Sequence, residues 1–365
     1  MKALSVLAAC TMLMASPLAP QTWKGTSVRQ GDIVVVKNPK TPVFSSSGFR
    51  FFDELTIGGG TLSPEAALGG IRDVAVAADG SVFIADYKQG KILTFGPDGQ
   101  YLFSFGKRGQ GPGEFSSPNQ VSVRNERREI FVDGSRKGVV FNREGRFKEN
   151  TTYPLDLMMV RSDERGALAG TVVDNTQPKG IYRLIKTGGD IGTPLILATA
   201  PLIDLNAPDP FMPRLAWDLC PDGSIAEGFP ETYEIHIHDP AGRILRTVSR
   251  EYDPAPVTER DEQAYLKTVP PGVMAETGKP RFSKRFPAFQ RIVADERGWL
   301  FVQTYERARD GKNFLTDIFD SDGRYMARFG EGGTVFRARG GKMYVVSEDE
   351  EGFPIVKRYG LEGNK

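Results

Sequence analysis

The chain has 365 residues and is close to neutral, with 47 basic and 46 acidic side chains and a net charge of +1. Nucleic-acid binding depends on clustered positive charge, so this balance gives no reason to expect a nucleic-acid partner. The 41 glycines and 25 prolines interrupt the sequence too often for long helices and favour short strands joined by turns.

Residues 1–22 have the pattern of a signal peptide. Lys2 precedes an apolar stretch that ends near Met14, and small residues with prolines follow. This apolar stretch is too short to span a bilayer, so it predicts export to the periplasm, the cell envelope or the medium. Residues 7–10, Leu-Ala-Ala-Cys, also match the lipobox of bacterial lipoproteins. In that alternative Cys10 would carry a lipid anchor, the only attachment to a membrane that we expect.

Removal of the leader would leave Cys220 as the only cysteine. No intramolecular disulfide could then form, although an exported protein meets conditions that permit one. We therefore expect the fold to be stabilised by burial of apolar side chains.

Two strands are predicted between the leader and the first repeat. Gly31–Phe44 has the pattern of one strand that ends in a proline-bounded loop. Phe49–Gly60 ends in an apolar residue followed by glycines, as later strands do, but no partner strand stands just before it. An unpaired strand edge costs stability and invites aggregation, so this second strand must pair with a distant part of the chain.

The stretch Phe105–Pro118, FGKRGQGPGEFSSP, joins two segments that share one pattern of strands and turns. A phosphate-binding loop would need a helix directly after the glycines, whereas a proline and alternating apolar residues follow here. We therefore interpret the glycines as turn residues. The stretch and the strands around it resemble the NHL-repeat family of β-propellers, most strongly over residues 71–150.

One glycine-containing turn between two strands recurs from residue 71 to the C-terminus. Successive turns are about 40 to 50 residues apart, except for one interval of about 80 residues. A repeat of this length is typical of a propeller blade, which has four antiparallel strands. The landmark glycines of these turns are Gly99, Gly145, Gly189, Gly242, Gly323 and Gly363.

The resemblance and the period together imply an all-β fold, a six-bladed β-propeller of four-stranded antiparallel blades, over residues 31–365. The last blade lacks a fourth strand near the C-terminus, and Phe49–Gly58 is the strand that fits. We expect this strand to pair with Pro354–Tyr359 and so to close the ring.

The long interval contains one blade and an insertion at about 254–289. Thr258 is suited to cap a helix, Asp261 stands in the first turn and two prolines end it, so a helix is predicted over Glu259–Thr268. A long loop inside a compact fold is usually functional, and this one leads into a first strand. We expect it either to cover the mouth of the channel or to pack its helix on the blade surface.

His236 and His238 are the only histidines and would point to the same face of a strand. With Asp239 they could form a metal site. The repeat places them in the third strand of a blade, away from the channel, which favours packing instead. Asp86 and Asp133 follow second strands, where the resemblance to NHL repeats implies that an aspartate ties down the neighbouring loop.

The loops that lead into the first strands ring one mouth of the channel in a propeller. Arginines that converge there would suit an anionic or carboxylate ligand, because arginine binds carboxylates through paired hydrogen bonds. The alternative is that they pair with acids such as Asp73 and Asp218 and close the channel. The candidate ligand-binding residues are Arg72, Asp73, Asn119, Arg214, Gln290 and Arg291, and Gln120 stands in the same set of loops.

These features predict an exported binding or scaffolding module for a small-molecule or protein ligand, monomeric and without a cofactor. The alternative is a propeller hydrolase or lyase of the gluconolactonase or strictosidine synthase-like type, with Ca²⁺ or Zn²⁺ at the channel mouth. The chain contains no GxSxG, HExxH or CxxC motif, and no residue set of those enzymes can be placed on it. No catalytic or metal-binding residue is therefore assigned.

Overall fold

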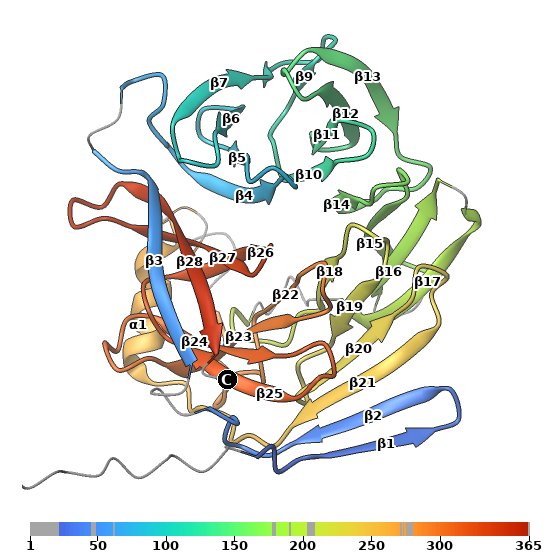
Figure 1. Cartoon of the computed structure of the whole chain (residues 1–365), viewed down its shortest axis with the longest axis vertical. Coiled ribbons are helices and arrows are strands. Elements are labelled where there is room, and N and C mark those ends of the chain that lie inside the picture. The colour runs from blue at the N-terminus through green and yellow to red at the C-terminus, as the bar shows by residue number, and fades with distance from the viewer. Residues whose placement is uncertain are drawn as a thin grey trace, which may run out of the picture.

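Six sheets stand around a central channel like the blades of a propeller in the computed structural model (Figure 1). The structure describes residues 22–44, 49–60, 63–176, 180–189, 191–202, 209–270, 272, 274 and 280–363. The predicted all-β, six-bladed fold is therefore confirmed. The predicted leader, with Cys10, lies outside the described residues apart from Thr22. Within this described part, no helix has the length and apolar character needed to cross a membrane.

Each blade is an antiparallel sheet whose strands follow one another from the channel to the rim. Blades 1 to 3 consist of β4 (Ile71–Val76), β5 (Val82–Asp86), β6 (Lys91–Phe95) and β7 (Tyr101–Phe105); β10 (Gln120–Arg124), β11 (Glu129–Asp133), β12 (Lys137–Asn142) and β13 (Phe147–Thr152); and β14 (Met158–Ser162), β15 (Leu168–Asp174), β16 (Ile181–Gly188) and β17 (Ile191–Pro201). Between blades 1 and 2, two short strands pair in parallel, β8 (Lys107–Arg108) and β9 (Glu114–Phe115).

The other three blades follow the same order, and an N-terminal strand completes the last one. Blades 4 to 6 consist of β18 (Ala216–Leu219), β19 (Ile225–Gly228), β20 (Glu234–His238) and β21 (Ile244–Arg250); β22 (Arg291–Ala294), β23 (Leu300–Arg307), β24 (Phe314–Phe319) and β25 (Tyr325–Phe329); and β26 (Thr334–Arg339), β27 (Lys342–Glu348), β28 (Pro354–Gly363) and β3 (Phe49–Gly58).

The core lies between the blades. The second strands β5 and β11 are buried at every residue because neighbouring blades cover both faces, and their sequences are accordingly almost continuously apolar. The rim strand β13 is exposed at most positions and is largely polar. This difference explains why the inner strands were easier to recognise from apolar runs than the rim strands.

The ring is closed by β3, which pairs antiparallel with β28 from Gly58 opposite Ile355 to Phe49 opposite Gly363. The predicted closure is confirmed. The predicted turn at Gly363 is wrong, because β28 extends to this glycine, which pairs with Phe49 of β3.

The remaining landmark glycines lie between the third and fourth strands of their blades, where the chain reverses. They have φ angles in the left-handed region, which favours glycine because other side chains are strained there. These glycines and their φ angles are Gly99 (81°), Gly145 (76°), Gly189 (60°), Gly242 (85°) and Gly323 (81°).

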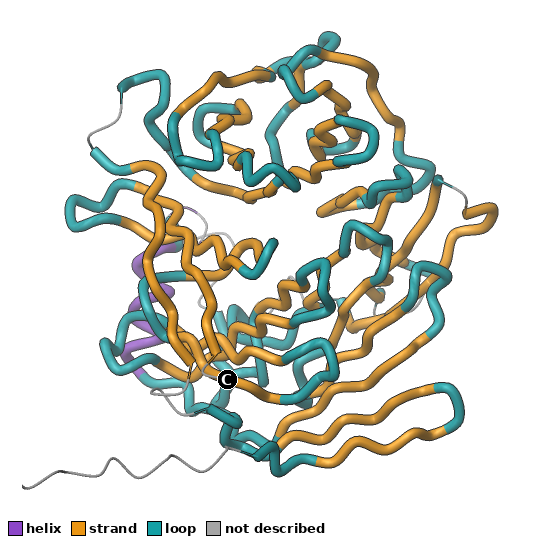
Figure 2. Tube along the Cα trace, viewed as in Figure 1, coloured by secondary structure: helices purple, strands orange, loops and turns teal. Residues whose placement is uncertain are grey.

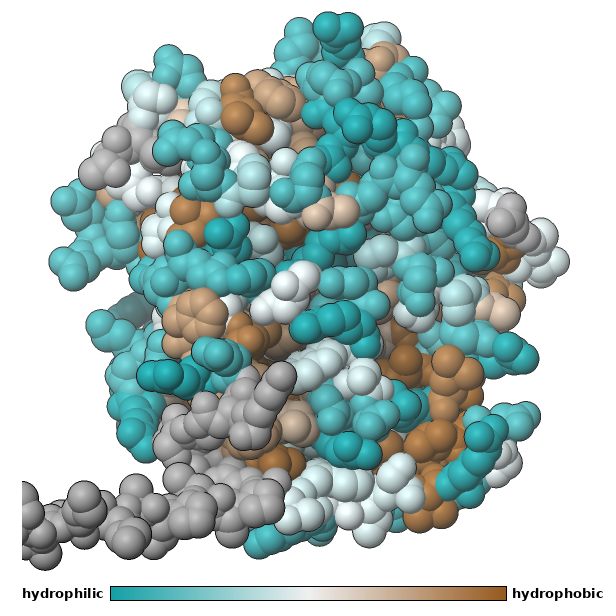
Figure 3. Space-filling view, in the orientation of Figure 1, coloured by the Kyte–Doolittle hydropathy of each residue, from teal (hydrophilic) through white to brown (hydrophobic). Residues whose placement is uncertain are grey.

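The strand predicted within Gly31–Phe44 is present and ends before a loop with two prolines, but the strand that precedes it was not predicted. The chain forms a hairpin of β1 (Thr26–Gln30) and β2 (Ile33–Asn38), with Gly31 at φ 61° in the two-residue turn. Because β2 pairs in parallel with β21, the sheet of blade 4 has six strands. The face of the molecule in Figure 3 is mostly hydrophilic. A group of apolar side chains lies at its lower right, where Figure 1 shows this six-stranded sheet.

The insertion contains the predicted helix, α1 (Glu259–Thr268), with a capping box between Thr258 and Asp261. Asp261 also forms an ion pair with Arg307 at the end of β23, which holds the helix against blade 5. Figure 2 shows the helix in purple beside the ring of strands and away from its centre.

Candidate functional site

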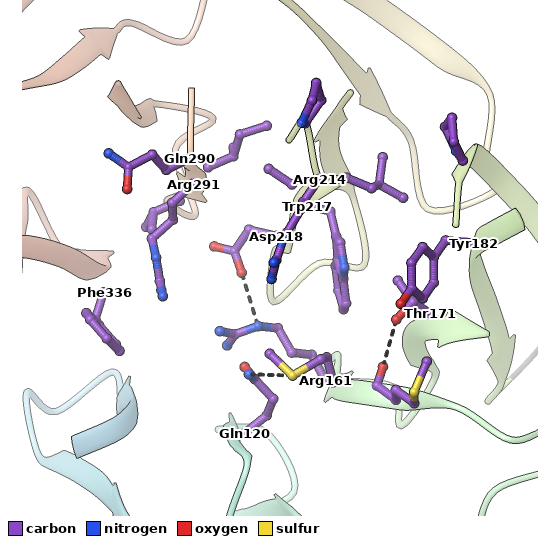
Figure 4. Close-up of a pocket in the computed structure, with 18 residues that line it drawn as sticks. Gln120, Arg161, Thr171, Tyr182, Arg214, Trp217, Asp218, Gln290, Arg291 and Phe336 are labelled. Atoms are coloured by element: carbon purple, nitrogen blue, oxygen red, sulfur yellow. Dashed lines mark hydrogen bonds and ion pairs between the residues drawn. The ribbon is translucent and has the colours of Figure 1, made fainter. Parts of the chain in front are cut away.

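A pocket of about 380 Å³ opens at the channel mouth where the chain leads into the first strands (Figure 4). The first strands of blades 2 to 6 all contribute to its wall. The side chains that matter most for its chemistry are Gln120, Arg161, Arg214, Trp217, Asp218 and Arg291.

The floor of this pocket is a network of buried charges that crosses the channel. Arg161 on β14 donates to Asp73 on β4 at 3.1 Å and lies 3.4 Å from Asp218 on β18. Arg337 on β26 lies 3.4 Å from Asp218 and 3.9 Å from Asp73. The aspartates thus stand on the opposite blades 1 and 4, and the arginines on the opposite blades 3 and 6.

Each aspartate of this network also binds the backbone of the next blade. Asp73 accepts the N–H of Val121 at 3.0 Å, and Asp218 accepts the N–H of Ala294 at 3.0 Å. Both carboxylates are almost completely buried, at 1% and 2% exposure. They therefore have a structural role between neighbouring blades in addition to their pairing with arginines.

The two arginines of the network are not equally well compensated. Burial lowers the pKa of Arg161, but the charges of Asp73 and Asp218 outweigh burial and raise this pKa above its ordinary value. Burial and the positive charge of Arg161 hold the pKa of Arg337 below its ordinary value, although the same aspartates face it. Asp73 and Asp218 thus favour the charged form of Arg161 more strongly than that of Arg337.

Two further arginines, Arg214 and Arg291, point into the pocket above this floor (Figure 4). Arg291 lies over the ring of Phe336, 4.2 Å from its centroid. Burial lowers the pKa of Arg291, and the charge of Asp73 offsets this only in part. Among the residues that the structure describes, neither arginine has a carboxylate within ion-pair distance.

The pocket and its floor therefore hold four arginines and two aspartates, an excess of two positive charges, and of the two unpaired arginines Arg291 is partly buried while Arg214 is exposed. Arginine stays protonated at neutral pH, so this excess persists in the folded protein. A bound anion would lower the electrostatic free energy of such a site, because the pocket is only partly open to water.

The rest of the wall is apolar and aromatic. Met158 and Met159 are 41% and 43% exposed there, which is unusual for large apolar side chains. Met159 has φ 56°, a strained value for a residue other than glycine, at a bulge between Met158 and Arg161. Trp217 and Tyr182 line the same side of the pocket (Figure 4).

The structure brings together some of the candidate site residues and separates others. Arg214, Gln290 and Arg291 line the pocket, and Asp73 lies in its floor. Arg72 is exposed on β4 and does not line it.

Two candidates for the mouth are amides on neighbouring positions of blade 2. Asn119 does not line the pocket and donates to the hydroxyl of Ser135 at 2.8 Å, within its own blade. Gln120, the next residue, does line it. Neighbouring residues of an extended chain point in opposite directions, so Asn119 faces its own blade while Gln120 faces the channel.

Sequence reasoning missed Arg161 and Arg337, which pair with the aspartates in place of the arginines considered. Arg161 stands in the first strand MMVRS, and Arg337 stands in the first strand TVFRAR, which also contains Arg339. A charged residue in a first strand, where the channel is the only polar environment nearby, was the signal that could have identified them.

The two histidines lie on β20, the third strand of blade 4, as predicted. Their ring nitrogens lie 3.0 and 3.1 Å from one oxygen of Glu227 on β19, and Asp239 pairs with Arg243 instead. The described residues contain no group of three or more His, Cys, Asp and Glu side chains that could hold a metal ion.

The aspartates that follow second strands have the predicted structural role. Asp86 accepts the N–H of Gly69 at 2.6 Å, and Asp133 accepts the N–H of Val160 at 3.1 Å. The first bond ties β5 to the chain that leads into β4, and the second ties β11 to the first strand β14 of the next blade.

No described residue of the 254–289 insertion lines the pocket. Tyr265 of α1 and Phe286 contact the ring of Phe211 at centroid distances of 6.2 and 4.8 Å. Phe211 belongs to the segment that carries Arg214. In its described part the insertion thus packs behind the wall of the pocket. None of the described contacts supports the hypothesis that it covers the mouth.

Comparison with known proteins agrees with this fold. A family model described as a 6-bladed beta-propeller matches residues 63–178. The chain is similar to a candidate exported protein from Bacteroides fragilis, with a TM-score of 0.58 and 11% identity over 91% of this chain and 100% of that one. A DUF4221 family member from Bacteroides vulgatus gives a TM-score of 0.53 and 10% identity over 87% and 100% of the two chains.

A gluconolactonase from Xanthomonas campestris gives a TM-score of 0.47 and 12% identity over 81% of this chain and 87% of that one. No curated protein matches the chain. These findings identify a six-bladed β-propeller, and the NHL-repeat type stays a prediction.

Proposed function

We propose that this protein is an exported binding module that takes up a small carboxylate in the channel-mouth pocket. The observation that carries the proposal is the pair Arg214 and Arg291, which face the pocket and have no carboxylate partner among the described residues. Export rests on the predicted leader, and the Bacteroides fragilis relative in structure is itself a candidate exported protein.

A carboxylate is the anion that best suits this arrangement. A guanidinium group offers paired N–H donors whose spacing matches the two oxygens of a carboxylate. The pocket volume lies near the lower end of the range for small-molecule sites, roughly 300 to 1,000 Å³. This size favours a small molecule over a protein loop as the ligand, and a monomeric protein suffices to form the site.

The test is calorimetric titration of the mature protein with a panel of small carboxylates, in parallel with the variants Arg291→Gln and Arg72→Gln. We expect Arg291→Gln to weaken binding about 10- to 100-fold, because a charge-assisted hydrogen bond is lost. Arg72 is an exposed arginine of a first strand that does not line the pocket, so Arg72→Gln is the matched control and should bind like the parent.

Failure of every carboxylate to bind, or equal affinities in all three proteins, would overturn the proposal. The alternative hydrolase or lyase would instead require Ca²⁺ or Zn²⁺ in stoichiometric amount. Elemental analysis of the purified protein distinguishes the two functions.

A further inference from the structure

The wall of the pocket contains a buried amide whose hydrogen-bonding capacity is not used by the protein. Gln120, the first residue of β10, is only 6% exposed. Its side-chain oxygen Oε1 is buried and has no hydrogen-bond partner among the described residues. An unpaired polar atom inside a protein costs stability, so a ligand in this pocket that supplied the missing partner would be favoured.

The orientation of this amide determines which partner is missing. The side-chain Nε2 donates to the sulfur of Met159 at 3.9 Å, and the dashed line in Figure 4 marks this contact. Rotating the amide by half a turn would place its oxygen against the sulfur, and both of these atoms are acceptors. The oxygen is therefore the free end of the amide, and its missing partner is a hydrogen-bond donor.

The apolar part of the wall indicates what else the ligand contains. Tyr182 and Trp217 stand on one side of the pocket and Phe336 on the other, on three different blades (Figure 4). Met158 and Met159 add exposed thioether side chains, which contact aromatic rings favourably and adapt to their shape. An aliphatic acid as small as lactate would leave these surfaces in contact with water.

We infer that the ligand is an aromatic carboxylic acid that also carries a hydroxyl or amide N–H group, which donates to Gln120 while Arg214 and Arg291 bind the carboxylate. This inference rests on the proposed function and adds the ring and the donor to it. Arg161 in the floor is already paired with Asp73 and Asp218, so the two unpaired arginines receive the carboxylate.

The experiment is calorimetric titration of the mature parent protein with five acids. 3-Phenylpropionate has a ring and a carboxylate only. 3-Phenyllactate, 3-(4-hydroxyphenyl)propionate and N-acetylphenylalanine each add one donor at a different position, and lactate lacks the ring. We expect at least one donor-bearing aromatic acid to bind at least about tenfold more tightly than 3-phenylpropionate, because a site built for a donor discriminates against ligands that lack it. Lactate should bind most weakly.

The variant Gln120→Met keeps the length and burial of the side chain and removes the amide. We expect it to bind 3-phenylpropionate like the parent and to lose the preference for the donor-bearing acid. Arg291→Gln should weaken all four aromatic acids to a similar extent. The comparison among acids on the parent protein needs no variant, so it decides the inference even if Gln120→Met does not fold.

The outcomes separate this inference from the proposed function. If 3-phenylpropionate binds in an Arg291-dependent way and no donor-bearing acid binds more tightly, the donor is refuted and the carboxylate site stands. If lactate binds as tightly as the aromatic acids, the ring is refuted. If none of the five acids binds but another carboxylate of the panel does, this inference fails and the proposed function stands. If no carboxylate binds, or Arg291→Gln changes nothing, the proposed function fails and this inference fails with it.

Discussion

Two buried clusters of charge in this propeller differ in how completely their charges are paired. Between blades 4 and 5, Arg250 and Arg328 face Asp317 and Glu306, so two positive charges meet two negative ones. Arg328 lies 2.8 Å from both carboxylates, and Arg250 lies 2.7 Å from Glu306 and also pairs with Asp317. At the channel mouth, Arg161 and Arg337 share Asp73 and Asp218, whereas Arg214 and Arg291 have no carboxylate within ion-pair distance among the described residues.

The pKa values of the arginines follow this difference. Burial lowers the pKa of Arg250 and of Arg328, but Asp317 and the other acidic groups around them together outweigh burial, and both pKa values lie above the ordinary value. The pKa values of Arg291 and Arg337 lie below it. Arg337 still has Asp218 at 3.4 Å, whereas Arg291 has no carboxylate within ion-pair distance among the described residues, so Arg291 is the candidate for binding a molecule from outside.

Both clusters require a closed ring, so opening the ring should have the largest effect on the molecule. Removal of residues 1–60 deletes β3 and leaves the edge of β28 unpaired, and we expect an aggregating protein in which neither cluster forms. Size-exclusion chromatography and circular dichroism measure this. Removal of residues 1–22 alone is the control and should leave a soluble monomer. A soluble, fully folded protein without residues 1–60 would show that β3 is dispensable for closure.

The balanced cluster should be highly sensitive to loss of one carboxylate. Asp317 accepts hydrogen bonds from Tyr233 at 2.7 Å and Tyr325 at 2.6 Å in addition to its two arginines. Asp317→Asn leaves buried positive charge unpaired, so we expect the free energy of unfolding in urea to fall by about 3–5 kcal/mol.

The control for this experiment is Asp253→Asn, which removes an exposed ion pair with Lys40. Exposed pairs contribute little, so the control should change the free energy of unfolding by less than about 1 kcal/mol. Equal losses in both variants would mean that the buried cluster does not stabilise the contact between blades 4 and 5.

Loss of one carboxylate from the charge cluster at the channel mouth should lower the stability of the protein but raise its affinity for an anion. Asp218→Asn removes a negative charge from the floor of the pocket, and we expect the free energy of unfolding to fall by about 1–3 kcal/mol. The same change increases the excess of positive charge, so affinity for 3-phenylpropionate should rise about threefold or more. If calorimetry instead shows that affinity falls together with stability, the excess charge does not drive anion binding.

A smaller effect is expected from pH. The hydrogen bond with Glu227 raises the pKa of His236 above 6.5, so His236 binds its proton more tightly in the folded than in the unfolded protein. The resulting stability is present below the unfolded pKa and is lost as the pH rises through the folded pKa. We therefore expect the free energy of unfolding to decrease slightly from about pH 6 to about pH 8, while anion binding stays constant because arginines do not titrate there.

The control for the pH experiment is His236→Gln, which should flatten this dependence between the same pH values. A parent protein whose stability is constant or rises over the range would contradict the assignment of His236. A change in anion affinity over the range would show that a titrating group, and not only arginine, takes part in binding.

Local signals were sufficient for much of the fold. The turn period predicted the blades, Thr258 and Asp261 predicted α1, and an unpaired strand predicted closure by β3. The hairpin of β1 and β2 was missed because its turn at Gly31 was taken as the start of a strand, and its pairing partner β21 lies some two hundred residues away in the chain.

The candidate site was predictable only in part. Arg214 and Arg291 stand in loops or at strand starts where the repeat places the channel mouth, so they could be identified. The pairing of Arg161 with Asp73 and Asp218 joins three blades, and no pattern in a single blade encodes it. Which arginines remain unpaired therefore became evident only from the assembled ring.

The most direct test of the difference between the clusters is the free energy of unfolding of Arg291→Gln without any ligand, measured beside Arg250→Gln. We predict that Arg291→Gln is as stable as the parent, within about 0.5 kcal/mol, or more stable, because it removes an uncompensated charge. Arg250→Gln should lose about 3 kcal/mol or more, because Asp317 and Glu306 lose a partner. A loss in Arg291→Gln as large as that in Arg250→Gln would contradict the account, because Arg291 would then be a structural arginine and not one left free for a ligand.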